Sequence, residues 1–211
     1  MLAITFDFLT GIAYLDGRAA GRQGKAEFPP HPDRVFMALV AAWGGSDDAE
    51  RSALEWLESA GSPSIVASDT RDRPTLNVYS PGNDDLQNYT DGERNVDRRV
   101  SSTVPDSPRV TYIWDADPPP SICRSLEDVL GRVGYLGRSE SMVSAWLSDT
   151  NESPTWIPVE RSGRMMRVPY PGRLAELVAA YGVGMRPSAA AWAGYQRADA
   201  KPSEGSEWDT L

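Results

Sequence analysis

One short segment, 134–141, concentrates side chains that could bind an anion. It supplies a cation at Arg138, hydroxyls at Ser139 and Ser141, and a carboxylate at Glu140. Glycines at its start and middle let the backbone adopt a positive φ or approach a neighbour closely. The segment suits either an anion site or a tight structural turn in which Glu140 pairs with a nearby arginine. Its composition does not choose between these two interpretations.

A second group of polar and basic side chains lies in 80–108, where apolar periodicity is lost. A segment of this length without secondary structure is usually functional or disordered. The sequence therefore predicts a structureless insertion that is either solvated or in contact with a ligand. The candidate contacts are Arg94, Asn95, Arg98, Arg99 and Ser101.

The residues at 10–32 are rich in glycine and charge and predict a flexible basic loop that contains Arg22 and Lys25. Lysine occurs again only at Lys201, so nearly every cation is an arginine. The planar guanidinium is suited to bidentate contacts with phosphate or carboxylate. A GC-rich genome would produce the same bias.

The single histidine, His31, is the obvious candidate for catalysis. Cleavage of RNA through its 2′-hydroxyl needs a general base and a group that stabilises the phosphorane, which His31 with Lys25 or a tyrosine could supply. A histidine flanked by prolines at a helix start is more often a turn residue, so we expect no catalytic residue. One histidine and one cysteine cannot furnish the usual metal ligands, and no glycine-rich fingerprint precedes a helix. We therefore expect neither a metal nor a nucleotide cofactor.

Composition also predicts the compartment of the protein. Cys123 is the only cysteine and cannot form an internal disulfide, which favours a reducing environment. No apolar run approaches the ~20 residues that span a bilayer, so we expect a cytoplasmic protein without a membrane partner. The formal charge of −9 argues against indiscriminate binding of nucleic acid, while a local basic patch would still permit RNA binding.

Hydrophobic patterns predict an alternating order of elements. Period-two alternation indicates strands, and apolar stripes at helical spacing indicate helices. The expected order is strand, helix, strand, strand, helix, strand, which is the ferredoxin-like split βαβ arrangement of an α+β fold, with an open sheet face that can take single-stranded RNA. The strands are expected at 2–9, 64–68, 75–79, 109–114 and 142–147, and the helices at 33–43, 47–60 and 121–133.

The rest of the chain predicts an extension of the same domain. A strand is expected at 156–159, then a basic segment with Arg161, Arg164 and Arg167, and a helix at 173–181. We expect one domain over 1–197, with a thumb-like insertion at 80–108 and a C-terminal extension at 151–197. The polar and acidic tail at 198–211 has little to bury and is expected to be disordered.

Several short motifs, taken in their order, resemble a known family. The chain is similar to the fifth family of CRISPR-associated proteins, of the RAMP superfamily, in the version found in type I-U (also called I-G) systems. The motifs are Phe8-Leu9-Thr10-Gly11, the Phe28-Pro29-Pro30-His31-Pro32-Asp33-Arg34 segment before an apolar helix, Leu136-Gly137-Arg138-Ser139-Glu140-Ser141, and the helix from Gly172 to Tyr181.

The resemblance implies an RRM-like subunit that holds the 5′ handle of the CRISPR RNA in a Cascade surveillance complex. Its partners would be that RNA, the backbone and large subunits, and target DNA indirectly. By position, 80–108 corresponds to the thumb that packs against the guide RNA in such proteins. Arg22, Lys25, Arg34, Arg138 and Ser139 join the thumb residues as candidate RNA contacts. Many relatives continue into a half that processes the RNA precursor, which this sequence, ending at Leu211, is expected to lack.

Two alternatives remain at this stage. The first is an endoribonuclease that itself processes the CRISPR RNA precursor, with His31 as its catalytic residue. The second is a protein-only adaptor that touches no RNA, which the acidic net charge favours. The sequence favours the non-catalytic RNA-binding subunit over both.

Overall fold

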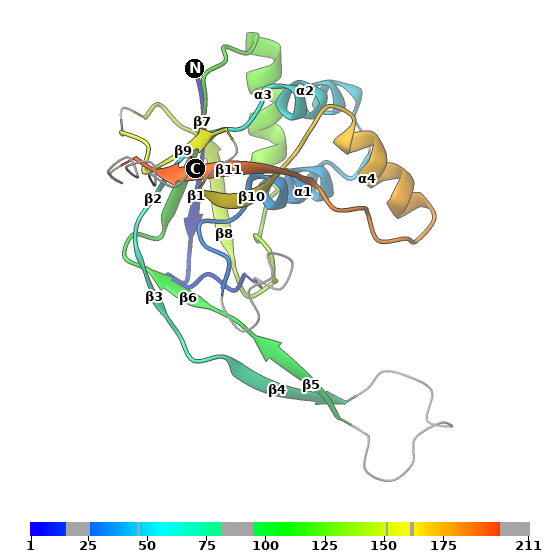
Figure 1. Cartoon of the computed structure of the whole chain (residues 1–211). Helices are drawn as coiled ribbons and strands as arrows, with labels where there is room; N and C mark the ends of the chain where they lie inside the picture. Colours follow the sequence, from blue (N-terminus) through cyan, green and yellow to red (C-terminus); the bar gives the residue numbers. More distant parts are fainter. Residues whose placement is uncertain (16–25, 46, 82–94, 151, 161–162, 199–211) are drawn as a thin grey trace, which may run out of the picture.

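The computed structural model describes residues 1–15, 26–45, 47–81, 95–150, 152–160 and 163–198, and the side chains of these residues outside 76–81 and 95–99 (Figure 1). Its body is a seven-stranded sheet in the order β10-β11-β9-β2-β7-β1-β8. The neighbouring strands pair antiparallel throughout. Together with four helices, this makes the mixed α+β architecture that the sequence predicts.

The sheet is built around β1 (Leu2–Phe8), which lies between β7 (Arg109–Trp114) and β8 (Val143–Leu147). Beyond β7 lies β2 (Ser64–Ala67). These four strands were expected from their apolar patterns, and the structure confirms them. Alternate side chains of β1 form the predicted buried face, and Ile4 and Phe6 are fully buried.

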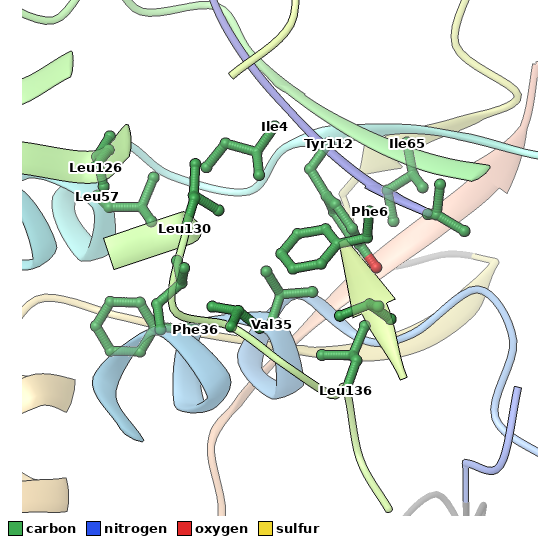
Figure 2. Close-up of a cluster of buried hydrophobic side chains, with 14 of the residues drawn as sticks. Ile4, Phe6, Val35, Phe36, Leu57, Ile65, Tyr112, Leu126, Leu130 and Leu136 are labelled. Carbon is green, nitrogen blue, oxygen red and sulfur yellow. The ribbon is translucent and has the colours of Figure 1, made fainter. Parts of the chain in front are cut away.

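The predicted helices are also confirmed, as α1 (Pro32–Trp43), α2 (Asp48–Ser59) and α3 (Pro120–Leu130). Figure 2 shows their apolar stripes meeting the strands in one core. Each large apolar side chain in such a core contributes about 1.5–3 kcal/mol relative to exposure. The labelled members are Ile4, Phe6, Val35, Phe36, Leu57, Ile65, Tyr112, Leu126, Leu130 and Leu136.

Local signals fix where the first two helices begin and end. Pro32 stands at the start of α1, where a missing N–H costs nothing, and Gly44 ends it with a φ of 65°. The carboxylate of Asp47 accepts a hydrogen bond from the backbone N–H of Glu50 at 2.8 Å and caps α2. Among the described residues, none of the helices combines the length and the apolar character needed to cross a bilayer.

The C-terminal part widens the sheet with β9 (Trp156–Val159), β10 (Arg164–Val168) and β11 (Ala191–Arg197), and α4 (Arg173–Gly182) connects the last two. The sequence predicts β9 and α4 but neither β10 nor β11. Arginine, glycine and alanine are frequent in these two strands and are poor strand formers, so local propensity gives little signal. Their pairing, with Met166 opposite Ala193, supplies the stability instead.

Between β2 and β7 the chain forms a two-stranded arm that leads away from the body (Figure 1). Its inner part pairs β3 (Thr70–Asp72) with β6 (Thr103–Pro105), and its outer part pairs β4 (Leu76–Pro81) with β5 (Asn95–Val100). The expectation of a structureless segment is therefore wrong for β5 and β6, and the expected strand at 75–79 lies in the arm rather than in the body. Backbone hydrogen bonds hold such a ribbon, so it does not require the apolar alternation of a core strand.

A buried ion pair fastens α4 to the start of α1. The guanidinium of Arg173 donates to both carboxylate oxygens of Asp33, at 2.9 and 3.2 Å, and both side chains are at most 2% exposed. Asp33 lies in the first turn of α1, as the sequence predicts, but its charge is neutralised by a residue 140 positions away. Arg173 also donates to Glu176 at 3.3 Å and to the carbonyl of Ser188 at 3.2 Å, and it supplies the buried cation that faces Asp33.

Replacing Asp33 with alanine should lower the free energy of unfolding by about 3 kcal/mol, because the buried Arg173 would keep only the partly exposed carboxylate of Glu176, at 3.3 Å, as a charged partner. Urea denaturation followed by circular dichroism would measure the change. The matched control is Glu55→Ala, which breaks the exposed pair between Arg51 and Glu55 (2.9 Å) and should cost less than about 1 kcal/mol. Equal costs for the two variants would contradict the role of the buried pair.

Candidate nucleic-acid interface

The arm holds three of the predicted RNA contacts on one strand. Asn95, Arg98 and Arg99 belong to β5, where Arg98 lies opposite Val78 and Arg99 opposite Asn77. Asn95 is opposite Pro81, at the end of the ribbon farthest from the body. Three further predicted contacts, Arg94, Arg22 and Lys25, fall outside the described residues.

The root of the arm is anchored to the N-terminal segment. Thr103 and Ala13 exchange two backbone hydrogen bonds of 3.0 Å, and the Thr103 hydroxyl donates to the carbonyl of Arg71 at 2.9 Å. Ser101, another predicted contact, is only 3% exposed and lies next to the equally buried Ser102. Ser101 is therefore below the surface, and backbone hydrogen bonds attach this part of the arm to the body.

The segment 134–141 forms a closed turn between α3 and β8. Tyr135 and Met142 form an isolated antiparallel bridge, and the fully buried Ser141 accepts a hydrogen bond from the backbone N–H of Tyr14 at 2.6 Å. Gly137 has a φ of 87°, and a Cβ there would lie 2.6 Å from the Cδ2 of Leu15. Glycine is therefore required at this position for both its backbone conformation and its small volume.

Within this turn, Arg138 and Glu140 pair with each other. A guanidinium N–H donates to Glu140 at 3.2 Å, and the Ser139 hydroxyl donates to the same carboxylate at 3.2 Å. The hydrogen bond from Arg138 is the main reason that the pKa of Glu140 is lowered. Over the described residues, the Nε of Arg138 is buried without a hydrogen-bond partner. The geometry is that of the structural turn, with Arg138 about one-third exposed.

Arg34 lies beside this turn, across a cavity of about 330 Å³ that α1 and the turn enclose. Its guanidinium donates to both oxygens of Glu27, at 2.7 and 3.1 Å, in a bidentate pair. The Arg34 side chain is 16% exposed and that of Glu27 is fully buried. The structure thus brings two predicted contacts, Arg34 and Arg138, to one neighbourhood, and both carry a carboxylate partner.

Glu27 is the centre of a buried polar cluster. Besides Arg34, it accepts hydrogen bonds from the backbone N–H of His31 at 3.0 Å and from the guanidinium of Arg167 at 3.0 Å. Burial alone would raise the pKa of this carboxyl, but the bonds and charge of Arg34, with help from His31, outweigh it and hold the pKa at about 2. Glu27 is therefore ionised at neutral pH.

His31 is fully buried in the same cluster, and burial lowers its pKa to about 4. Its Nδ1 accepts from the backbone N–H of Arg167 at 3.2 Å and from the Arg167 side chain at 3.4 Å. The neutral ring therefore carries its proton on Nε2, which has no hydrogen-bond partner in the described part of the chain. The 3.6 Å between Nδ1 and Glu27 is a contact with a neutral ring at pH 7 rather than an ion pair.

Sequence reasoning missed this cluster, although it noted Arg167 in a basic segment. Glu27 stands in a stretch that predicts a flexible loop, and its partner Arg167 is 140 positions away. Among the described residues, no group of three or more histidine, cysteine, aspartate or glutamate side chains could hold a metal ion.

Comparison with known proteins gives the class of the protein. A family model described as CRISPR-associated protein, GSU0054 family, matches residues 3–207 and so covers nearly the whole chain. The protein is thus a CRISPR-associated protein, with a CRISPR-related role. It belongs to the GSU0054 family, and the CRISPR-associated part of the resemblance is confirmed.

Solved structures and curated proteins give no further assignment. A solved structure titled "Crystal structure of a CRISPR protein from Archaeoglobus fulgidus" aligns with 75% of this chain and 69% of its own, at 13% identity and a TM-score of 0.33. No curated protein matches the chain. The assignment to a CRISPR-associated family therefore depends on the family model.

Replacing Gly137 with alanine should destabilise the fold by about 1–3 kcal/mol, because an L-residue is strained at this φ and its Cβ would meet Leu15. Gly134 belongs to the same turn, and a Cβ there would meet nothing within 4 Å. Gly134→Ala is therefore the matched control and should change stability much less. Thermal unfolding of both variants would measure the difference, and similar melting temperatures would contradict the close approach.

The burial of His31 predicts a pH dependence of stability. The unfolded chain takes up a proton near pH 6.5 and the folded chain only near pH 4, so the unfolded state binds more protons between these values. Stability is present above pH 6.5 and is lost as the pH falls towards 4. From pH 7 to pH 4.5, the free energy of unfolding should fall by about 2 kcal/mol more in the wild type than in His31→Asn.

Urea denaturation at several pH values would measure this difference. Asparagine cannot titrate, but its side-chain oxygen can replace Nδ1 as an acceptor. Glu27, whose lowered pKa depends in part on the charge of His31, affects stability mainly below about pH 4.5, which is outside the range compared. An identical pH profile in the variant would show that His31 titrates normally in the folded protein.

Proposed function

We propose that this chain is a non-catalytic CRISPR RNA-binding subunit of a type I Cascade surveillance complex, of the I-U version. It would hold the 5′ handle of the guide RNA and contact the backbone and large subunits of the complex. The observation that carries this proposal is the arm, because it places a strand with adjacent arginines outside the body of a protein of the GSU0054 family. Arg98 and Arg99 are the only neighbouring pair of arginines in the sequence.

The order of the four central strands supports the RAMP assignment. In the sheet, β7 separates β2 from β1, and β1 separates β7 from β8. Each helical connection, through α1 and α2 or through α3, thus joins two strands with one strand between them. This order supports the proposed split βαβ pattern of ferredoxin-like folds. The arm joins β2 to β7, and this position supports its assignment as the expected thumb.

The environment of His31 supports a role without catalysis. A general base must reach the proton that it removes, and His31 is buried, neutral and bonded to Arg167 through Nδ1. We propose that His31 holds α1 and β10 together and that the chain cleaves no RNA. Guide RNA and the other subunits would be its partners in the cytoplasm, with target DNA met only through the assembled complex.

Replacing Arg98 and Arg99 together with alanine should weaken binding to a CRISPR RNA that carries its 5′ handle. If each arginine neutralises one phosphate of a single strand, the slope of log K against log salt should decrease by about 1.4. Fluorescence anisotropy with labelled RNA, from 50 to 300 mM salt, would measure both quantities. Arg51 and Arg124, exposed on α2 and α3, provide the matched double-alanine control, which should bind like the wild type.

An unchanged slope in the arm variant would count against the thumb assignment, and failure of the wild type to bind RNA would favour a protein-only adaptor. The same reactions test catalysis without another variant. Gel electrophoresis of precursor RNA after incubation should show it intact, whereas specific cleavage would identify an endoribonuclease.

A further inference from the structure

A second basic feature lies in the body, where the arm is attached. A cavity of about 220 Å³ opens between the N-terminal segment at 26–29, the arm root at 68–72, and the strands β9 to β11. This space exceeds that of a single water several-fold, so it can admit a larger group. Its lining includes Phe28, Trp156, Arg164 and Arg197, together with two carboxylates, Asp69 and Asp72.

Strand pairing gathers the two arginines around one indole. Arg197 lies directly opposite Trp156 on the neighbouring strand, and Arg164 lies opposite Tyr195, two residues before Arg197. Opposite and alternate positions share a face of the sheet. The guanidinium carbons of Arg164 and Arg197 are 5.4 and 5.5 Å from the centroid of the Trp156 ring, within the range of cation–π attraction.

Polar contacts also orient the two guanidiniums. Arg164 donates to the backbone carbonyl of Phe28 at 2.5 Å, and Arg197 donates to the carboxylate of Asp69 at 2.7 Å. The Asp69 side chain is 73% exposed, and an exposed ion pair contributes little free energy. A phosphate could therefore compete with Asp69 for Arg197 at small cost. The five N–H donors of a guanidinium allow contact with more than one acceptor at a time.

We infer that this cavity binds a backbone phosphate of single-stranded RNA, through the guanidiniums of Arg164 and Arg197. Trp156 acts as a positioning residue that holds both cations towards the cavity. The inference rests on the proposed RNA-binding function and adds a contact in the body that the arm alone does not provide. An RNA strand that follows the arm to its root would reach this cavity next.

The test uses the full chain and a fluorescein-labelled, mixed-sequence single-stranded RNA of 12 nucleotides. Arg197→Gln should raise the Kd about tenfold at 0.15 M salt and lower the salt slope by about 0.7, the value for one phosphate on a single strand. Trp156→Phe keeps both cations and a smaller ring, so it should raise the Kd by a smaller factor with an unchanged slope. Melting temperatures would verify that both variants fold.

The matched control is Arg109→Gln. Arg109 also lies over an indole, that of Trp146 at 5.9 Å, and pairs with Asp7 at 3.3 Å, but it does not line this cavity. Its replacement should leave the Kd and the slope unchanged. If Arg109→Gln lowered the affinity for RNA as much as Arg197→Gln, the inference would be overturned, because the effect would then come from net charge rather than from the cavity.

Failure of the inference is distinguishable from failure of the proposed function. If the wild type and Arg197→Gln bind equally while the Arg98→Ala, Arg99→Ala variant is weakened, the cavity is not a phosphate site and the arm assignment stands. If the wild type binds no RNA, the proposed function and the inference both fail. A loss of RNA affinity in Arg197→Gln that is absent in Arg109→Gln supports the cavity as a phosphate site.

Discussion

The body of this protein depends on one buried carboxylate. Glu27 accepts hydrogen bonds from Arg34 of α1, from Arg167 of β10 and from the backbone of His31. An ionised carboxylate without partners would be very costly in such a place, so the two arginines must be present and correctly placed for the segment before α1 to pack. The same contacts hold the C-terminal strands against the first helix, and therefore the N-terminal and C-terminal halves of the chain are one structure.

The Asp33 and Arg173 pair acts in the same way. It attaches α4 to the start of α1, next to the Glu27 cluster along the sequence. Two arginines from the C-terminal extension, Arg167 and Arg173, thus neutralise two acids from the first crossover. This division of charges explains why the extension behaves as part of the main sheet. Strand β11 pairs with β10 and β9, and its last residue, Arg197, contacts Asp69 at the root of the arm.

Sequence periodicity was sufficient for the elements that face the core. The stripes of α1, α2 and α3 reflect burial on one side, which the local sequence pattern indicates. The alternation of β1 places its large apolar side chains on one face, although Ala3 and Thr5 on the other face are also buried. No such apolar pattern marks β10, β11 or the arm. The stability of these elements depends on partners distant in sequence or on backbone pairing alone. The roles of Glu27 and Trp156 could not be predicted either, because no local pattern indicates which arginine will contact each side chain. Glu27 pairs with an arginine 140 positions away, and Trp156 lies opposite an arginine on another strand.

The number of arginines is a poor guide to where RNA could bind this protein. Arg34, Arg167 and Arg173 are at most 16% exposed and are committed to carboxylates inside the fold. Excess negative charge of the whole chain is compatible with RNA binding only if cations are concentrated where a strand can reach them. Position in the fold, rather than charge, therefore distinguishes the arginines of the arm and of the cavity at its root from those that hold the body together.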